Sequence, residues 1–399
     1  MRAQLERDFE RFKRGLPRDF AAHVRAAYRI DLAARYAGES LPHPIGKGSG
    51  QLSLNAGQLE EDAAAGLAFV VLKTVIAEDE AGVRAMAAWA IHETRMRVER
   101  RAAPDGRPGW TVTWKGRGWD GTLDQYLALV RAGRDLTRGG GLLVVPSVKY
   151  HLPPLDQPFR DGEYRHTTMR LAQAWGMAPL LLEKDFSPTL AGDALADDRA
   201  QILRWLREVP GRIRAAAPLP VRVAVKLMNA RFDDAFQVEM MQVAAGAGAD
   251  ALVCFNRLFD PERGVAYGGW DLSDRNLRVL DLLPESPHLR AGSVGLTPGA
   301  SPGIPGLTGT GNICSGRMIL EYARRGCESV ELHTFFQLPL SEYPATHGSR
   351  TQRALHALVF APDHGLIAGM LELAARGEIE RRDGELHFLD VRAHAHRPG

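Results

Sequence analysis

The sequence predicts an α/β protein of the (β/α)8 TIM-barrel class. Short, nearly continuous apolar runs alternate with helical segments through the middle of the chain, and eight such runs occur. Runs of this kind are typical of parallel strands buried on both faces, because helices cover one face and the barrel core the other. Eight strands alternating with helices favour a closed barrel over an open sheet. A length of 399 residues suits such a barrel with additions at its ends.

The first forty residues predict a helical arm, residues 1–44, in front of the barrel. Leu5, Phe9 and Phe12 recur at helical spacing, and a second apolar stripe continues to about Ala37. This pattern favours an arm whose apolar face packs on the main domain. The alternative is a surface that meets a membrane or a partner, because Arg and Lys fill the other face.

The barrel itself is predicted over residues 45–345. The expected strands are 52–57, 67–75, 141–148, 178–186, 221–227, 249–256, 303–311 and 328–336. The expected helices are 78–93, 123–135, 199–216, 234–248 and 315–326. Two stretches rich in glycine carry no clear element, 97–122 and 285–303.

A short helix and hairpin extension, residues 346–399, is expected after the barrel. Within it, residues 377–391 predict a hairpin about Asp383-Gly384. The histidines of the final residues alternate, and we interpret them as solvated rather than as metal ligands.

Composition excludes several classes of protein. Fifty Lys+Arg against 48 Asp+Glu give a net charge of +2, which argues against a nucleic-acid binder. Three cysteines without a CxxC string indicate neither a zinc ribbon nor an iron–sulfur cluster, and they favour a reducing compartment. No run is long enough to span a bilayer, and the charged start does not resemble a signal peptide. We therefore expect a cytoplasmic protein with no transmembrane segment.

The active site of a barrel lies at the C-terminal ends of its strands. Two lysines, Lys73 and Lys226, end otherwise apolar strands. Burial of an unpaired lysine is costly, so each is expected to face an anion or an electron-rich ligand. The alternative is that each forms a salt bridge with Asp or Glu.

The segment after the seventh expected strand predicts a phosphate-binding turn. Gly311 and Asn312 leave the strand, and Ser315 and Gly316 open a helix whose N–H groups point back toward it. A tight turn without a ligand is the alternative. No Walker A string or Rossmann fingerprint is present, so a separate NAD domain is not expected.

Together these strings resemble the dihydroorotate dehydrogenase-like FMN barrels. LSLNAG followed by LAFVVLKTV is similar to the opening of that family, VRVAVKL to its PVxVKL strand, and ADALVCFN to the strand that ends in a flavin-contacting asparagine. CFNRLFDPERG is similar to a branch with an FNRF string. TGTGNICSGRMILEYARRGCESVELHTFF resembles the phosphate segment. The resemblance covers about residues 45–340.

The resemblance implies bound FMN and assigns contacts to the matching positions. Ala56 and Gly57 would lie under the isoalloxazine, Lys73 and Thr74 would contact the flavin, and Lys226 would face its N1/O2 edge. Asn256 would contact the ring or the ribityl chain. The phosphate would be surrounded by Gly311, Asn312, Ser315, Gly316 and Thr334, with His333 in place of a glycine.

Two departures from the family concern the substrate. The fourth strand ends KDFSPT where the family has NLSCPN, so Ser187 falls at the general-base position and Lys184 replaces an asparagine. The loop 113–121 keeps the glycines of the substrate loop but not its amides. Amides that both donate and accept hydrogen bonds hold the pyrimidine ring, so the substrate is not expected to be dihydroorotate.

The resemblance therefore implies an FMN-dependent oxidoreductase acting on CH–CH bonds of a small polar substrate, cyclic or not. A base near Ser187 would take a proton while hydride passes to flavin N5. If the strand stays regular, Asp185 points to the same side as Ser187, which leaves open a relay of the proton through it. Ser187, Lys226 and Lys184 are the catalytic candidates. An unidentified electron acceptor is required, and the oligomeric state, a homodimer included, stays open. The alternatives are a catalytically silent barrel that serves as an assembly or regulatory subunit, and a non-redox barrel enzyme acting on a sugar phosphate.

Overall fold

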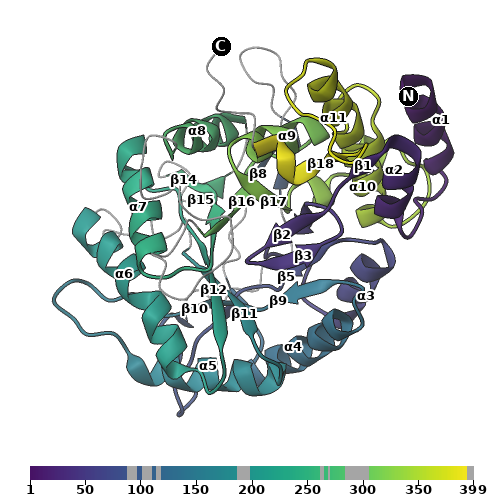
Figure 1. Cartoon of the computed structure of the whole chain (residues 1–399). Coiled ribbons are helices and arrows are strands. Elements are labelled where there is room, and N and C mark those ends of the chain that lie inside the picture. The colour runs from purple at the N-terminus through teal and green to yellow at the C-terminus, as the bar shows by residue number, and fades with distance from the viewer. Residues whose placement is uncertain are drawn as a thin grey trace.

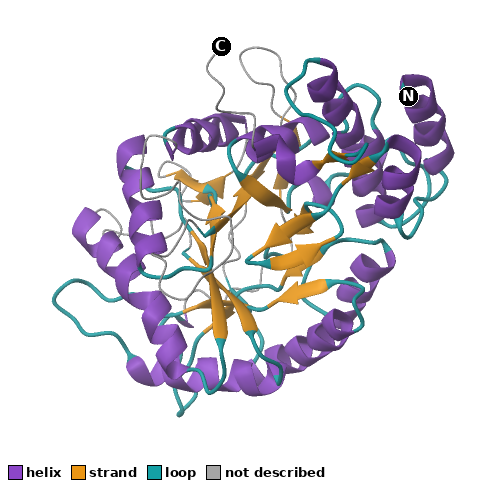
Figure 2. Cartoon of the chain, in the orientation of Figure 1, coloured by secondary structure: helices purple, strands orange, loops and turns teal. Residues whose placement is uncertain are grey.

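Ten strands, buried on both faces, form the centre of the fold. The computed structural model describes residues 1–87, 97–100, 110–113, 118–186, 198–260, 265–267, 270–283 and 305–392. Every pairing in the central sheet is parallel, and the sheet curls inside a ring of helices (Figures 1 and 2). In the order of the sheet the strands are β6 (Val75–Ile76), β10 (Ser147–Lys149), β11 (Leu180–Asp185), β12 (Val221–Lys226), β13 (Ala251–Cys254), β16 (Gly306–Thr310), β17 (Cys327–Leu332), β4 (Ile45–Lys47), β5 (Phe69–Val71) and β9 (Leu143–Val145).

Two pairs of these strands follow each other closely along the chain. Residues 72–74 separate β5 from β6, and Pro146, which lacks an N–H donor, separates β9 from β10. β5 pairs with β9, and β6 pairs with β10. Between these two ladders the Leu72 N–H donates to the Val145 carbonyl over 2.9 Å. The apolar runs of the sequence thus predicted these strands correctly.

Helices surround the sheet (Figure 2). They are α3 (Ala56–Ala64), α4 (Leu123–Arg138), α5 (Asp161–Trp175), α6 (Arg199–Ala216), α7 (Asp234–Gly246), α8 (Trp270–Asp281), α9 (Gly316–Arg324), α10 (Arg350–Phe360) and α11 (Leu366–Ala375). The predictions of α4, α6, α7 and α9 are confirmed within a few residues at each end. Side-chain caps fix several starts, for example Thr122 in a reciprocal capping box with Gln125.

The first barrel strand was predicted wrongly. Residues 52–57 were expected to form it, but the strand is β4, Ile45–Lys47. Asn55 ends the stretch because its side chain accepts a hydrogen bond from the Gln58 N–H and begins α3.

The helix expected over 78–93 is also wrong in its described part. Residues 78–87 form turns rather than an α-helix. The Asp79 carboxylate accepts from the Ala81 and Val83 N–H groups, and Gly82 has a φ of +75°. This local bonding competes with the helix ladder. Residues 88–93 lie outside the described part of the chain.

The N-terminal arm contains α1 (Arg2–Phe12) and α2 (Phe20–Tyr28), and its apolar stripe is buried except for Phe9, which is partly buried. The helix does not continue to Ala37, because Arg29 adopts a left-handed φ of 56°. Short strands follow it, namely β1 (Ile30–Asp31) and the hairpin of β2 (Ala34–Tyr36) and β3 (Glu39–Leu41). The arm packs against α10 and α11, so its apolar face meets this chain itself.

At the C-terminal end, the turn at Asp383-Gly384 is confirmed. Both residues have positive φ, 54° and 79°, and Arg382 bridges to Glu385. The residues after this turn do not form the second strand of the expected hairpin, because β18 (Leu386–His387) pairs in parallel with β1 instead. Residues 393–399, which hold both alternating histidines, lie outside the described residues.

The remaining elements are short. They are the hairpins β7 (Arg97–Arg100) with β8 (Trp110–Thr113) and β14 (Leu258–Asp260) with β15 (Val265–Tyr267), and the 3-10 helices η6 (Phe335–Gln337), η7 (Leu340–Glu342) and η8 (Phe388–Arg392). Within the described ranges, no helix has both the length and the apolar character needed to cross a membrane.

Candidate functional site

A cavity opens at the carboxyl ends of β4, β12, β13, β16 and β17. The space inside it and in its open mouth comes to about 810 Å³. Six residues predicted from the sequence line it, namely Lys226, Asn256, Gly311, Asn312, His333 and Thr334. Gly48, Arg257, Cys314 and Glu331 line it as well, and Trp110 reaches it from β8.

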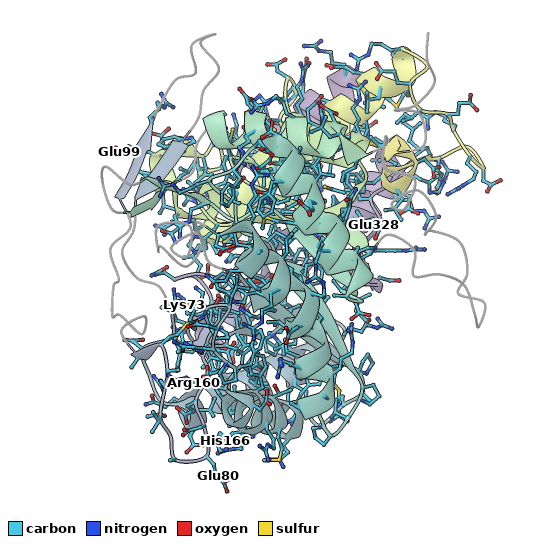
Figure 3. The ribbon with its side chains drawn as sticks, turned by 90° about the vertical axis from the view of Figure 1, so that its left-hand side faces the viewer. Lys73, Glu80, Glu99, Arg160, His166 and Glu328 are labelled. Carbon is cyan, nitrogen blue, oxygen red and sulfur yellow. The ribbon has the colours of Figure 1, made fainter. Side chains whose placement is uncertain are left out.

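A side view shows on which side of the molecule the carboxyl ends of the strands lie (Figure 3). Lys73, which follows β5, and Glu99 of the β7–β8 hairpin lie toward one side of the molecule in Figure 3. Glu328, near the start of β17, lies toward the other side. The hairpin is therefore on the side of the carboxyl ends, where barrels hold their active sites.

Lys226 ends β12 and forms a buried ion pair. Its Nζ lies 2.7 Å from Glu331 Oε2 and 3.8 Å from Glu183 Oε1. Burial lowers the pKa of Lys226, but the two carboxyl groups outweigh it and hold the pKa above its usual value. Of the two interpretations of this lysine, the salt bridge is the one that the structure shows, and Lys226 also lines the cavity.

Asp185 is the centre of a second buried group. Its Oδ2 lies 3.0 Å from Lys149 Nζ and accepts from Thr74 Oγ1 over 3.2 Å. Its Oδ1 accepts from Asn256 Nδ2 over 2.9 Å. Burial raises the pKa of Asp185, but Lys149 and Lys226 outweigh it, so the pKa lies below its usual value. The carboxylate thus fixes the amide of Asn256 at the cavity wall.

Lys184 does not lie where the sequence predicted. Successive side chains of a strand point to opposite faces, so Asp185 faces the group of Lys149 and Asn256 while Lys184 faces away from it. Lys184 Nζ donates to the Asp185 carbonyl over 2.7 Å and sits 4.2 Å from the Phe186 ring centre. Burial lowers the pKa of Lys184 to about 7. Asp185 therefore takes the position at the site that was assigned to Lys184.

Several predicted site residues lie outside the described residues. Ser187, the candidate base, is one of them, and so are residues 114–117 of the expected substrate loop. At the end of that loop, Trp119 donates from Nε1 to the Thr122 carbonyl over 3.0 Å.

The small residues beside the cavity are not Ala56 and Gly57, which lie in the first turn of α3. Gly48 and Gly50, directly after β4, take that place. A Cβ on Gly48 would lie 3.2 Å from Glu331 Oε2 and 3.5 Å from Lys226 Nζ. A Cβ on Gly50 would lie 1.9 Å from His333 Nε2, so a side chain there would displace the histidine.

The turn after β16 has the expected backbone. Gly311 has a φ of 112° and Asn312 a φ of 49°, which confirms that an asparagine can adopt the left-handed conformation here. The single O–H of Tyr322 is shared between the Thr310 carbonyl, 2.9 Å away, and the Gly311 carbonyl, 3.1 Å away. The turn is therefore held from behind while its other side borders the cavity.

Ser315 and Gly316 are not among the described residues that line the cavity. Ser315 Oγ accepts from the Met318 N–H over 3.2 Å, as an N-cap does. The N–H of Arg317, one residue before Met318, donates to the His364 carbonyl over 3.0 Å. The segment before α11 thus covers the start of α9, where the sequence predicted phosphate.

Gly316→Ala should lower the free energy of unfolding by about 1–3 kcal/mol, because overpacking a filled site forces its neighbours to move. A Cβ at this position would lie 1.9 Å from the Leu366 backbone nitrogen. Urea denaturation measures the change. In the control Gly57→Ala, the nearest contact is Asn55 Oδ1 at 3.4 Å, and no loss is expected. Equal stability of Gly316→Ala and wild type would contradict this packing.

Of the charged residues that line the cavity, Lys226 and Arg257 are bases and Glu331 is an acid. Burial lowers the pKa of Arg257 to about 10. Burial, with Lys149 and Arg257, lowers the pKa of Lys73 well below its usual value. Burial, again with Arg257 and Lys73, lowers the pKa of His333, which is therefore neutral at pH 7. Such a set favours an anionic ligand.

Sequence reasoning missed three charged residues of this region, Lys149, Glu183 and Glu331. Each lies in or next to a predicted strand whose other residues are mostly apolar. A charged residue inside such a run was the available signal, since a buried charge needs a partner.

Neither a family model nor a curated protein matches the chain.

Proposed function

We propose that this chain is an FMN-dependent oxidoreductase on a closed (β/α)8 barrel, similar in type to the dihydroorotate dehydrogenases but with another substrate. Closure is supported by the ladders at the two ends of the strand order. β6 begins that order and β9 ends it, yet β5 continues into β6 and β9 into β10. If β5 and β6 count as one strand and β9 and β10 as another, the sheet has eight strands. These two combined strands pair with each other along both halves, β5 with β9 and β6 with β10.

The observation that carries the cofactor proposal is a lysine held protonated at the cavity beside an asparagine and a left-handed turn. Lys226 and Asn256 would meet the flavin ring, and Gly311, Asn312 and Thr334 would meet its phosphate. A fixed cation suits the electron-rich edge of a flavin. The absence of a side chain on Gly48 leaves Glu331 and Lys226 open to a flat ring. When bound, FMN supplies the acceptor for the electrons of the substrate.

The substrate proposal depends on the buried pair of Lys149 and Asp185, which lies behind Asn256 of the cavity wall. An ammonium group only donates hydrogen bonds and a carboxylate only accepts them, whereas an amide does both. The pair therefore does not reproduce the amide pattern that holds a pyrimidine. We retain Ser187 as the proposed proton acceptor and a small polar molecule as the proposed substrate.

One alternative has support in the structure. The bases Lys226 and Arg257 at the cavity and the left-handed turn at Gly311 would equally suit a barrel that binds an anion without redox chemistry. Such a barrel would discriminate little between FMN and other phosphate esters.

Titration of the cofactor-free protein with FMN, FAD and riboflavin tests the proposal. Quenching of flavin fluorescence should show FMN binding at about micromolar concentration or tighter. Riboflavin should bind more weakly, because it lacks the phosphate. FAD should bind more weakly than FMN, since no adenine site is proposed. Equal weak binding of all three, at the level of an unrelated phosphate ester, would instead support the anion-binding barrel.

Dihydroorotate should not reduce the bound flavin at a measurable rate. A site whose polar groups are left unpaired by a ligand disfavours it by several kcal/mol, or more than about a hundredfold. Anaerobic mixing followed by absorbance measures the rate, with dithionite as the positive control. Rapid bleaching by dihydroorotate would mean that Lys149 and Asp185 do not exclude a pyrimidine.

A further inference from the structure

Two buried glutamates share one lysine inside the barrel. Glu183 and Glu331 are 0% and 1% exposed. Lys226 Nζ lies 2.7 Å from Glu331 Oε2 and 3.8 Å from Glu183 Oε1. If both carboxyl groups were ionised, this group of three would carry a net negative charge away from water. Such a charge is strongly disfavoured in a protein interior.

The available donors also do not satisfy two carboxylates, which are acceptors only. Glu183 Oε2 accepts from Tyr36 Oη over 3.1 Å. Glu183 Oε1 accepts from Ser147 Oγ over 3.4 Å, which is long for such a bond. Glu331 Oε1 is buried and receives no hydrogen bond from the described residues. A proton on Glu183 would supply the missing donor.

The polar and charged groups that face Glu183 determine whether it is ionised. Tyr36 comes from β2, Ser147 from β10, Lys226 from β12 and Glu331 from β17. Asp185, two residues along β11, adds negative charge but has its own partner in Lys149. Burial raises the pKa of Glu183 well above its usual value, and Glu331 raises it further, while Lys226 lowers it. Paired carboxyl groups in one site titrate as a unit that keeps one proton.

We propose that Glu183 and Glu331 share one proton at neutral pH and form a proton-binding site at the floor of the cavity. Glu183 O–H donates to Glu331 Oε1, and Glu331 Oε2 holds the ammonium group of Lys226. The shared proton makes the group of three neutral overall instead of negative. Because Lys226 and Glu331 line the cavity, the proton sets the charge that an incoming anion meets. The two glutamates are thus positioning residues for Lys226, and this assignment requires no particular cofactor.

Infrared spectroscopy of the cofactor-free protein at pH 8 tests the shared proton. The wild type should show the C=O stretch of a protonated carboxylic acid. That band should lose intensity in Glu183→Gln. It should also lose intensity in Glu331→Gln, because the remaining Glu183 then ionises against Lys226. The control Glu372→Gln, at a partly exposed pair with Arg317, should leave it unchanged. A spectrum in which neither cavity variant changes the band would overturn the proposal.

The pH dependence of stability gives a second, independent test. A carboxyl group whose pKa is raised in the folded state favours folding most at low pH, and this contribution is lost as pH rises from the ordinary value toward the raised one. Glutamine stays neutral and copies the protonated acid. The melting temperature of wild type relative to Glu183→Gln should therefore fall between about pH 5 and pH 8. A difference that stays constant or rises over this range would show that the pKa of Glu183 is not raised and would contradict the proposal. Both tests use protein without FMN, so they fail or succeed independently of the proposed function.

Discussion

Asp62→Ala should lower the free energy of unfolding by about 3–5 kcal/mol, the cost of leaving a buried charge without its partner. Lys47, at the end of β4, is 3% exposed and donates to Asp62 Oδ1 of α3. Thr351 of α10 donates to the same oxygen over 2.8 Å. Asp62 therefore joins α3 to β4 through Lys47 and to α10 through Thr351, and its loss weakens both contacts.

Urea denaturation measures this change, with Glu372→Ala as the matched control. Glu372 pairs with Arg317 over 2.8 Å, but both side chains are about half exposed. An exposed pair of this kind contributes about 0–1 kcal/mol. If Asp62→Ala and Glu372→Ala lose the same small amount, the buried pair does not stabilise the fold as its burial indicates.

Lys226→Met should slow reduction of the bound flavin about a hundredfold and weaken FMN binding less. A preorganised cation beside developing negative charge contributes roughly 3 kcal/mol to the rate. The contribution is large at this position because Glu183 and Glu331 keep Lys226 protonated. Methionine fills a similar volume without the charge, and stopped-flow absorbance after anaerobic mixing with a chemical donor gives the rate.

Arg222→Met is the control for this measurement. Arg222 lies on the same strand, β12, but at its opposite end, where it pairs with Glu39 over 2.7 Å. This variant should reduce at the wild-type rate. An unchanged rate in Lys226→Met would leave the lysine a purely structural role.

The sequence predicted the parts of the fold that local pattern encodes. The strands β11, β12, β13 and β17 are apolar runs with few competing interpretations, and α4 and α6 have regular apolar spacing. β4 was missed because Ile45–Lys47 has only three residues, one of them glycine. α5 was missed because part of its buried face is polar, as at Thr167 and Thr168.

The site was predicted in part for a related reason. The lining residues Lys226, Asn256 and Asn312 stand at the ends of strands or just after them. This is where the active site of a barrel is expected. Lys184 was misplaced by a single residue, and in a strand such a shift moves a side chain to the opposite face. The partnership of Lys226 with Glu331 spans 105 residues of chain. Only the curling of the parallel sheet, in which β13 and β16 separate β12 from β17, brings those two together, so no local pattern could have indicated the contact.

The cofactor of the freshly purified protein tests the central claim most directly. If Lys226, Asn256 and the turn at Gly311 form a flavin site, the sample should be yellow and should release FMN, not FAD, on denaturation. The absorbance spectrum before denaturation and chromatography of the released material after it give the result. A colourless protein that also fails to bind added FMN at about micromolar concentration would contradict the assignment.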